Sequence, residues 1–295
     1  MLNEGLSPKA INARKDALRA LTVELIEGFR GKGRCNFSHD FAEQLPIRIF
    51  LRMVDLPLAD APKLKHLADQ FTRPDGSLTF EQVEQGFSDY IGPVIAKRRG
   101  GSGDDLITQM VSGQVQGRDL TQDEAENLCT QALVGGLDTV VNLLGFVFAH
   151  LAQDDATRRA LAADPGKLDD AILEFLRRFP VVSDSREVIS ETAFGGVTLR
   201  PRDMVMASTV PIALSDRSNP EPMEFRLGRQ ARRQYIFGKG SHTCPGAHLA
   251  RAELKLVLEE WLARIPEFGL ASGKTLSFTS GIVATVDPFE LEWPL

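Results

Sequence analysis

Apolar residues recur at intervals of three and four over most of this chain, which is the periodicity of helices with one buried face. Thr121 and Glu124 stand three residues apart, the spacing of a capping box at the start of a helix. The pattern predicts a mainly α-helical protein, with helices over residues 8–30, 40–53, 60–71, 79–99, 121–152, 168–179 and 247–264.

Two regions have the alternating pattern of strands instead. Residues 196–199, a turn centred on Pro201 and residues 204–207 predict a hairpin within residues 194–214. A weaker strand region follows Ser272 and continues to Trp293. No repeat or low-complexity tract divides the chain. We therefore expect one domain over residues 1–295, a helical bundle with a long central helix and small β-hairpins.

Residues 132–152 are mostly apolar and long enough to span a bilayer. Gly135, Asp138, Asn142 and His150 interrupt this stretch, and a charged residue near the middle of a bilayer costs roughly 2.5 to 3.5 kcal/mol. We therefore interpret the segment as a helix through a protein core and expect no membrane partner.

The 295 residues are 43% hydrophobic and 25% charged, which is typical of a globular chain with a sizeable core. There are 34 Lys and Arg residues against 40 Asp and Glu residues, so the net charge is -6. Nucleic acid is therefore not expected as the main partner. Residues 1–8 hold no basic segment followed by an apolar one, so we expect no signal peptide and a cytoplasmic location.

Cys35, Cys129 and Cys244 lie far apart and form no C-x-x-C pair, and the five histidines form no H-E-x-x-H motif. Neither a disulfide framework nor one of the common zinc sites is therefore expected. A metal must be held in another way.

Cys244 stands in a glycine-rich loop, residues 237–246, directly before an amphipathic helix. Unpaired N–H groups and the positive end of that helix are expected to lower the pKa of its thiol and hold it as a thiolate. Gly240 and Gly246 are expected to allow backbone shapes that a Cβ would forbid, so that a flat ligand can approach. Phe237 can cover the sulfur from water.

Phe237, Gly240, Cys244 and Gly246 match the pattern F-x-x-G-x-x-x-C-x-G, and the loop thereby resembles the cytochrome P450 family. The resemblance implies the cytochrome P450 fold, with Cys244 as the axial ligand of haem b (iron protoporphyrin IX), and monooxygenase chemistry on dioxygen. The alternative is an inert cysteine in a glycine turn.

Residues 135–139, Gly-Gly-Leu-Asp-Thr, resemble the family's oxygen-activation motif. The resemblance implies that Gly135 lies close to the haem and that Thr139 and Asp138 are catalytic, the hydroxyl orienting dioxygen and the carboxylate relaying protons. The alternative is a helix kink in which a hydroxyl bonds the preceding turn.

Glu174 and Arg177 match the family's E-x-x-R pair on a helix upstream of the cysteine. Alone, such a pair is usually a solvated surface contact. Together with the cysteine loop, it implies a buried ion pair that locks the fold.

Further positions resemble the camphor-hydroxylating branch of the family. They imply that Asp184, Arg186 and His242 hold the haem propionates, for which an arginine fork is apt, and that Gly238 also contacts haem. They also imply a pocket for a small apolar, terpenoid-like substrate. The alternative is that the apolar residues of this pocket only pack in the core. The pocket residues are Gln131, Val134, Val182, Ile282 and Val283. Gln131 stands where that branch has leucine, which argues against camphor itself.

Basic residues gather in sequence around the cysteine loop and are expected to give a basic face for an acidic 2Fe-2S ferredoxin, which is served in turn by its reductase. The alternative is scattered solvated charges. The residues are Arg229, Arg232, Arg233, Lys239 and Arg251.

Met1 matches a point well inside the typical domain, so we expect the N-terminal third of the family's fold to be missing. Two alternatives to a full monooxygenase follow. One is a haem-binding remnant with little or no turnover, or one part of an assembly completed by another chain. The other is a helical interaction domain without a cofactor.

Overall fold

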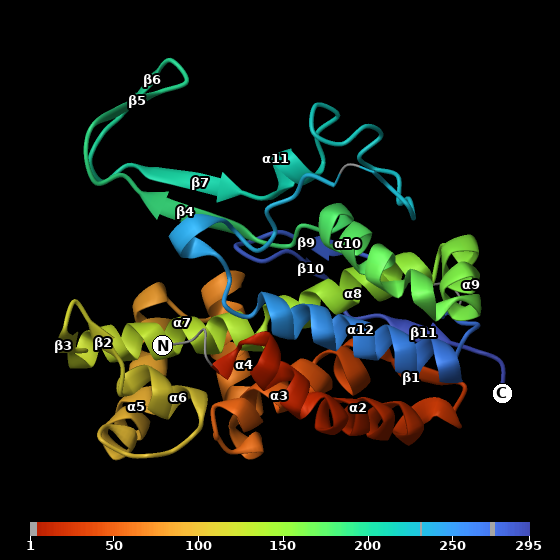
Figure 1. Ribbon diagram of the computed structural model, residues 1–295, viewed down its shortest axis with the longest axis horizontal. Helices are drawn as coiled ribbons and strands as arrows, with labels where there is room; N and C mark the ends of the chain where they lie inside the picture. Colours follow the sequence, from red (N-terminus) through yellow and green to blue (C-terminus); the bar gives the residue numbers. More distant parts are fainter. Residues whose placement is uncertain (1–4, 231, 272–274) are drawn as a thin grey trace.

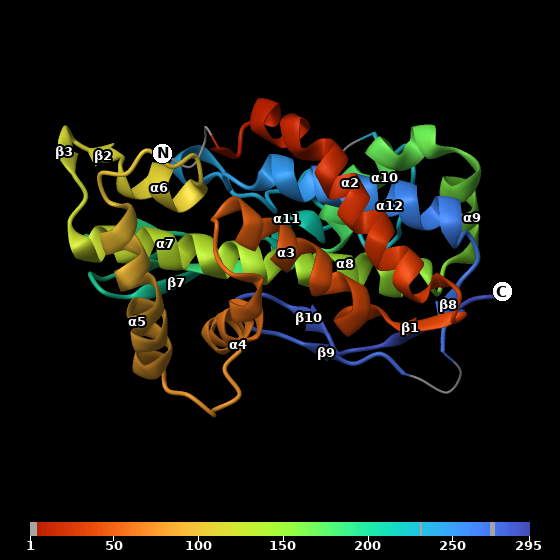
Figure 2. The same ribbon diagram turned by 90° about the horizontal axis from the view of Figure 1, so that it is seen from below.

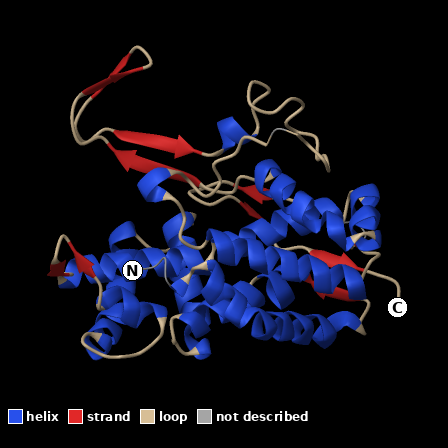
Figure 3. Cartoon of the chain, viewed as in Figure 1, coloured by secondary structure: helices blue, strands red, loops and turns tan. Residues whose placement is uncertain are grey.

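The computed structural model describes residues 5–230, 232–271 and 275–295. Helices form most of the molecule, and the strand pairs β4–β7 and β5–β6 (residues 183–208) and β9–β10 (residues 278–286) lie on one side of them, with β2–β3 (residues 114–119) at one end (Figure 1, Figure 3). This mainly helical architecture confirms the expected fold class. The helices are α2 (Pro8–Arg30), α3 (Gln44–Met53), α4 (Ala61–Thr72), α5 (Phe80–Arg98), α6 (Leu106–Val111), α7 (Gln122–Leu137), α8 (Thr139–Leu151), α9 (Asp155–Ala163), α10 (Leu168–Arg178), α11 (Val210–Ala213) and α12 (Ala247–Arg264).

Most predicted helices are confirmed to within a residue or two at each end. The range 40–53 is an exception, because the chain forms a π-helical turn over Phe37–Ala42 before α3 begins at Gln44. The short helices α6 and α9 were not predicted, since each is too brief to give a clear periodic pattern.

The long central helix is interrupted at Asp138, so the prediction of one helix over residues 121–152 is wrong at that residue. Asp138 has φ −124° and ψ −41°, α7 ends before it and α8 starts after it. The two helices continue along nearly one line in both views (Figure 1, Figure 2). The Thr139 hydroxyl donates to the Gly135 carbonyl at 2.7 Å, a side-chain bond that bends helices.

Within the described residues, one helical stretch, Gln122–Leu151, has the length and composition of a membrane span. However, most of this apolar stretch is buried inside the protein. This burial supports the interpretation of the segment as a core helix.

The strands pair antiparallel in small sheets. Residues 204–207 were expected to pair back on residues 196–199, and that prediction is wrong. The chain instead turns at Gly195 and Gly196, both with positive φ, and the 204–208 strand pairs with residues 183–187. Ser272, where the weaker strand region was expected to start, lies outside the described residues. The pairs are β1 (Arg34–Asn36) and β8 (Gly269–Leu270) with β11 (Glu290–Glu292), β2 (Gln114–Val115) with β3 (Arg118–Asp119), β4 (Ser183–Glu187) with β7 (Met204–Ser208), β5 (Thr192–Phe194) with β6 (Val197–Leu199), and β9 (Phe278–Thr279) with β10 (Thr285–Val286).

An aromatic cluster in the core fixes α12 relative to α8. Trp261 of α12 meets the ring of Phe148 of α8 edge-on, with ring centroids 4.8 Å apart. Phe37 stacks on Phe148 at 4.3 Å and also meets Trp261 edge-on at 5.4 Å. Such contacts add to the large apolar area that these side chains bury. Because the cysteine loop leads directly into α12, this cluster also positions Cys244 relative to the central helix.

Candidate functional site

The cysteine loop is held by its own backbone. The Cys244 N–H donates to the Phe237 carbonyl at 2.7 Å, and the Gly238 N–H donates to the Tyr235 carbonyl at 2.8 Å. Gly238 and Gly240 have φ of +68° and +67°, and a Cβ on Gly238 would lie 2.7 Å from the His242 carbonyl oxygen. These two positions therefore require glycine.

Gly246 does not meet the same expectation. Its φ is −79°, which any residue can adopt, and a Cβ there would make ordinary contact with the Cys244 sulfur at 3.7 Å. The prediction that Gly246 supplies a forbidden backbone shape is therefore wrong. Its N–H, together with that of Ala247, instead bonds the sulfur.

The prediction of a lowered thiol pKa is also wrong. Burial of the sulfur raises the pKa of Cys244, and it outweighs the backbone N–H groups of Gly246 and Ala247 and the positive charge of Arg251, which lower it. The chain alone therefore does not hold Cys244 as a thiolate. A bound metal cation would supply the missing stabilisation, since a coordinating thiol is deprotonated outright.

A cavity of about 760 Å³ lies beside the cysteine loop. Cys244, Tyr235 and Arg251 line it together with the start of α2. None of the three residues that were expected to hold propionates is among its lining residues, whereas the expected haem contacts Phe237 and Gly238 are. The expected propionate contacts therefore lie outside this cavity.

The two adjacent glycines of the central helix differ in what surrounds them. A Cβ on Gly136 would lie 2.4 Å from the ring of Phe50, so Gly136 is required by packing against α3. A Cβ on Gly135 would meet nothing within 4 Å, and Gly135 is exposed. Packing against Phe50 thus explains why residue 136 is glycine. At Gly135 the helix surface is not covered by any described side chain, and a planar ligand could lie against it.

Asp138 is completely buried and points into a cluster of polar groups. Both of its oxygens accept from Arg73 at 2.7 Å, and Thr72 and Asn142 donate to it at 3.0 and 2.8 Å. The Lys65 ammonium lies 3.5 Å away. Burial acts to raise the pKa of Asp138, but the hydrogen bonds and charge of Arg73 outweigh it, and the pKa lies below its usual value. Asp138 is therefore held as a carboxylate.

Sequence reasoning missed the partners of Asp138. Lys65, Asp69 and Arg73 are spaced four residues apart on α4, and this stripe was the available signal. Such a stripe is normally a solvated helix face. Here Arg73 leaves α4 at its C-terminal end, bonds Asp138 and also donates to the Val283 carbonyl at 3.1 Å.

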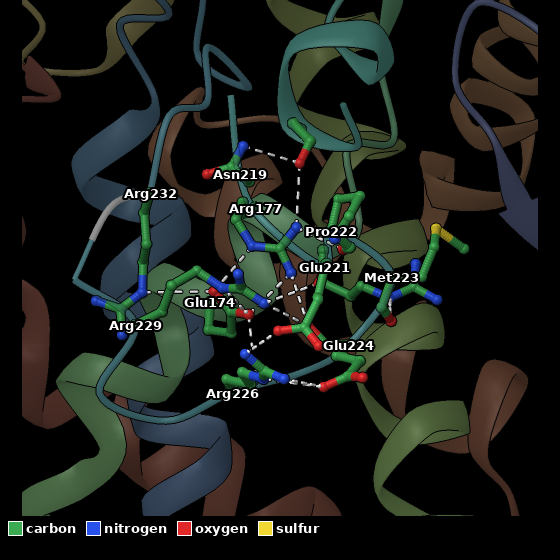
Figure 4. A network of polar contacts seen from close by, with 12 residues as sticks. Glu174, Arg177, Asn219, Glu221, Pro222, Met223, Glu224, Arg226, Arg229 and Arg232 are labelled. Atoms are coloured by element: carbon green, nitrogen blue, oxygen red, sulfur yellow. Dashed lines mark hydrogen bonds and ion pairs between the residues drawn. The ribbon is translucent and has the colours of Figure 1, made fainter. Parts of the chain in front are cut away.

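Glu174 and Arg177 lie buried on α10, with side chains that are 0% exposed (Figure 4). Arg177 donates to both Glu174 oxygens, at 2.9 and 2.8 Å. Its remaining N–H groups donate to the carbonyls of Ala213, Pro222 and Glu224 at 3.1, 2.7 and 3.0 Å. The pair therefore ties the irregular segment after α11 to α10.

Two of the arginines that were expected on a basic docking face belong to this same network. Arg229 lies 2.9 Å from Glu174 and its side chain is 6% exposed, while Arg232 pairs with Asp170 and lies 3.4 Å from Glu174 (Figure 4). Both arginines form ion pairs within the protein, so the prediction that they belong to a basic docking face is wrong for Arg229 and Arg232. Arg233 and Lys239 are exposed.

Asp184 and Arg186 share one face of β4, opposite Ala207 and Val205 of β7. Both are exposed and form an ion pair with each other. His242 is also exposed, at the end of a short 3₁₀ turn over Gly240–His242. These groups are free to meet a charged ligand from solvent.

The five residues expected around a substrate fall into two groups. Val182 forms a β-bridge with Val283, and Ile282 lies beside them because its carbonyl accepts from Ser183 at 2.8 Å. Gln131 and Val134 lie one turn apart on α7. Val134 and Val283 are only 5% and 2% exposed, which favours core packing for them, whereas Ile282 is 39% exposed.

Haem fits this arrangement as judged from the residues themselves. The sulfur of Cys244 accepts two backbone N–H bonds but lacks the cation that would hold it as a thiolate. Gly135 presents a helix surface that nothing in the described chain covers. Arg186 and His242 supply cationic and N–H groups at the surface.

Three comparisons with known proteins agree. The sequence model described as Cytochrome P450 matches residues 167–266. The curated relative "Probable cytochrome P450 127A1" of Sinorhizobium fredii is 30% identical over 300 residues, which are 99% of this chain and 71% of the relative. Two solved structures, of CYP101J2 and CYP101C1, are 60% and 39% identical with TM-scores of 0.88 and 0.87. Each covers 100% of this chain, which covers 74% and 75% of theirs.

Proposed function

The chain belongs to the cytochrome P450 family, whose members are haem b monooxygenases, and on that premise we propose that it hydroxylates a small apolar, terpenoid-like molecule. We further propose a cytoplasmic enzyme that takes its electrons from a 2Fe-2S ferredoxin and its reductase. The observation that carries the proposal is that Cys244 lines a cavity beside its own loop, and the helix surface at Gly135, which no described residue contacts, supports it.

In this proposal Cys244 binds the iron, and its loop supports it through Phe237, Gly238 and Gly246. Arg186 and His242 hold the propionates, and Asp184 orients Arg186 through the ion pair between them. Gly135 lets the helix approach the porphyrin face. Haem b held by a thiolate supplies the redox chemistry of dioxygen activation.

Thr139 acts through its hydroxyl. Because its proton is donated to the Gly135 carbonyl at 2.7 Å, the oxygen keeps its lone pairs to accept a hydrogen bond from a water or a substrate hydroxyl. In this role Thr139 orients a proton donor and does not itself give up a proton.

Asp138 supplies protons only when Arg73 releases it. Both carboxylate oxygens are engaged by Arg73, so a proton can be taken up at Oδ2 only after the Arg73 Nη1 contact of 2.7 Å opens. A carboxylate with a lowered pKa is protonated only to a very small extent near neutral pH. The proposed relay therefore depends on movement of α4 or of the Arg73 side chain.

The substrate class rests on the exposed apolar side chains of the predicted pocket. Ile282 is 39% exposed and Val182 is half-buried beside it. Gln131, which is exposed on α7, adds one amide that can bond a carbonyl or hydroxyl group of the substrate. We propose a mostly hydrocarbon molecule with a single polar group.

The ferredoxin proposal rests on fewer basic residues than the sequence predicted, because Arg229 and Arg232 are engaged inside the fold. Arg233 and Lys239 are exposed near the cysteine loop, and both can meet an acidic partner. Replacing each by glutamine should slow electron delivery by ferredoxin and make it less dependent on salt.

The test is haem loading followed by turnover. The purified chain should bind haem and give the thiolate-type Soret band in the reduced carbonyl complex. Cys244→Ser should abolish that band, whereas Ser241→Ala, an exposed change in the same loop, should leave it intact. An unchanged band in Cys244→Ser would refute the ligand assignment.

A second measurement separates an enzyme from a haem-binding remnant. With a ferredoxin and reductase, electron use should be coupled to hydroxylated product over a panel of small terpenoids. Loss of the electrons as peroxide, with a correct haem spectrum, would favour the remnant.

A further inference from the structure

Arg251 differs from the arginines that the protein buries most completely. Arg158, Arg177 and Arg229 are 3%, 0% and 6% exposed in their side chains, and each pairs with a carboxylate. Arg251 is partly buried, its Nε is buried, and no described residue accepts a hydrogen bond from that atom. No carboxylate among the described residues lies within ion-pair distance of it either. Its positive charge therefore has no ion-pair partner in the part of the chain that the structure describes.

Two features hold this charge beside Cys244. Arg251 lies in the first turns of α12, and helical side chains tilt toward the N-terminus, which here is the cysteine. Its guanidinium carbon lies 4.8 Å from the ring centroid of Phe237, a residue whose carbonyl accepts from the Cys244 N–H. The cation–π contact fixes the guanidinium over the cysteine loop.

The charge lies close enough to act on the sulfur, because Arg251 and Cys244 line the same cavity and the guanidinium lies over the ring of Phe237 in the cysteine loop. A cation near a ligating sulfur stabilises the form of the site that carries more negative charge. Reduction of ferric haem by one electron adds one negative charge to the site, so the reduced form gains most.

We propose that Arg251 is a positioning residue that acts through Cys244 and raises the reduction potential of the bound haem. This rests on the proposed function, since it needs haem ligated by Cys244. The electron comes from an electrode in the test below, and from an iron–sulfur protein in the proposed enzyme.

The experiment is a spectroelectrochemical titration of the haem-loaded chain without substrate or ferredoxin. Arg251→Gln and Arg251→Met remove the charge, whereas Arg251→Lys keeps it. We expect the neutral variants to lower the equilibrium constant for reduction about tenfold, which for one electron is about 59 mV toward more negative potential. Arg251→Lys should recover most of that shift.

Lys239→Gln is the matched control. Lys239 also belongs to the cysteine loop and lies over an aromatic ring, 5.4 Å from the centroid of Tyr235, but it is exposed. Its removal should leave the potential unchanged. An equal shift in Lys239→Gln and Arg251→Gln would show a general surface-charge effect and overturn the proposal.

The remaining outcomes are also decisive. An unchanged potential in a neutral Arg251 variant that loads haem overturns the inference. If neither neutral variant loads haem while Arg251→Lys does, the charge is needed for binding rather than for tuning, and the inference is again overturned. A wild-type chain without the thiolate-type spectrum would instead refute the proposed function, before any potential is measured.

Discussion

Arg177 offers the sharpest test of how the fold is held together. Replacing it by methionine removes the buried charge that Glu174 faces and keeps most of the side-chain volume. It also removes the donors to the carbonyls of Ala213, Pro222 and Glu224. Glu174 keeps Arg229 at 2.9 Å, so its carboxylate is not left wholly unpaired.

The expected loss follows from these contacts. Removing one partner of a buried ion pair costs about 3 to 5 kcal/mol. Because Arg229 remains beside Glu174, we expect the lower end, about 3 kcal/mol, a large share of the roughly 5 to 15 kcal/mol by which natural domains are stable.

Urea unfolding, followed by the fluorescence of Trp261 and Trp293, measures this loss. The matched control is Arg118→Met, which breaks an exposed pair between Arg118 and Glu124 at 2.7 Å. Exposed pairs contribute little, so the control should unfold close to wild type. Equal losses in the two variants would refute the reasoning that burial gives the Glu174 network its importance.

Three further predictions concern single side chains. Gly136→Ala should destabilise the haem-free protein because its Cβ would meet Phe50, whereas Gly135→Ala should not lower stability but should weaken haem binding; thermal melts and haem titration distinguish the two. Asp138→Asn should destabilise the protein, since the pKa of Asp138 is lowered on folding. Its stabilising effect is present above the unfolded pKa of about 3.9 and is lost as pH falls through the folded value, so unfolding curves of variant and wild type should converge in acid. Burial raises the pKa of Glu253 to about 8, so wild-type stability should fall as pH rises from about 4.3 toward that value, and Glu253→Gln should flatten this part of the stability–pH curve.

Local patterns were enough to predict the helices that present one face to the core. α2 and α10 have their apolar residues on one side, whereas α12 was expected to be amphipathic and is instead buried on nearly all sides; the ranges of all three agree with prediction to within a residue. The motifs at Cys244 and Glu174 were likewise visible, because each is confined to a few consecutive residues. What they imply about chemistry came from the family resemblance.

Several of the errors involve partners distant in sequence. The strand at 204–208 pairs with residues 183–187 and not with the nearer residues 196–199. Gly195 and Gly196 form a tight turn that pairs residues 197–199 with residues 192–194 instead. Arg229 was assigned to the surface because nothing near it in sequence shows that Glu174, 55 residues earlier, accepts its hydrogen bond. The thiol pKa was misjudged because helix position could be read from sequence and burial could not.

The polar groups of this chain fall into two sets. Those that are paired within the protein hold the fold, and those without a buried partner are available to a ligand. Glu174 and Asp138 are fully buried and fully engaged by arginines, so their geometry is set by the protein. Within the described residues, Arg186 pairs only with its neighbour Asp184, and Arg251 pairs with no carboxylate. Charges that folding leaves unmatched remain available to pair with a ligand of opposite charge. The groups that folding leaves unsatisfied are thus the ones through which haem binding should change stability most, and removing haem should affect Arg186→Gln, at a proposed propionate contact, less than wild type.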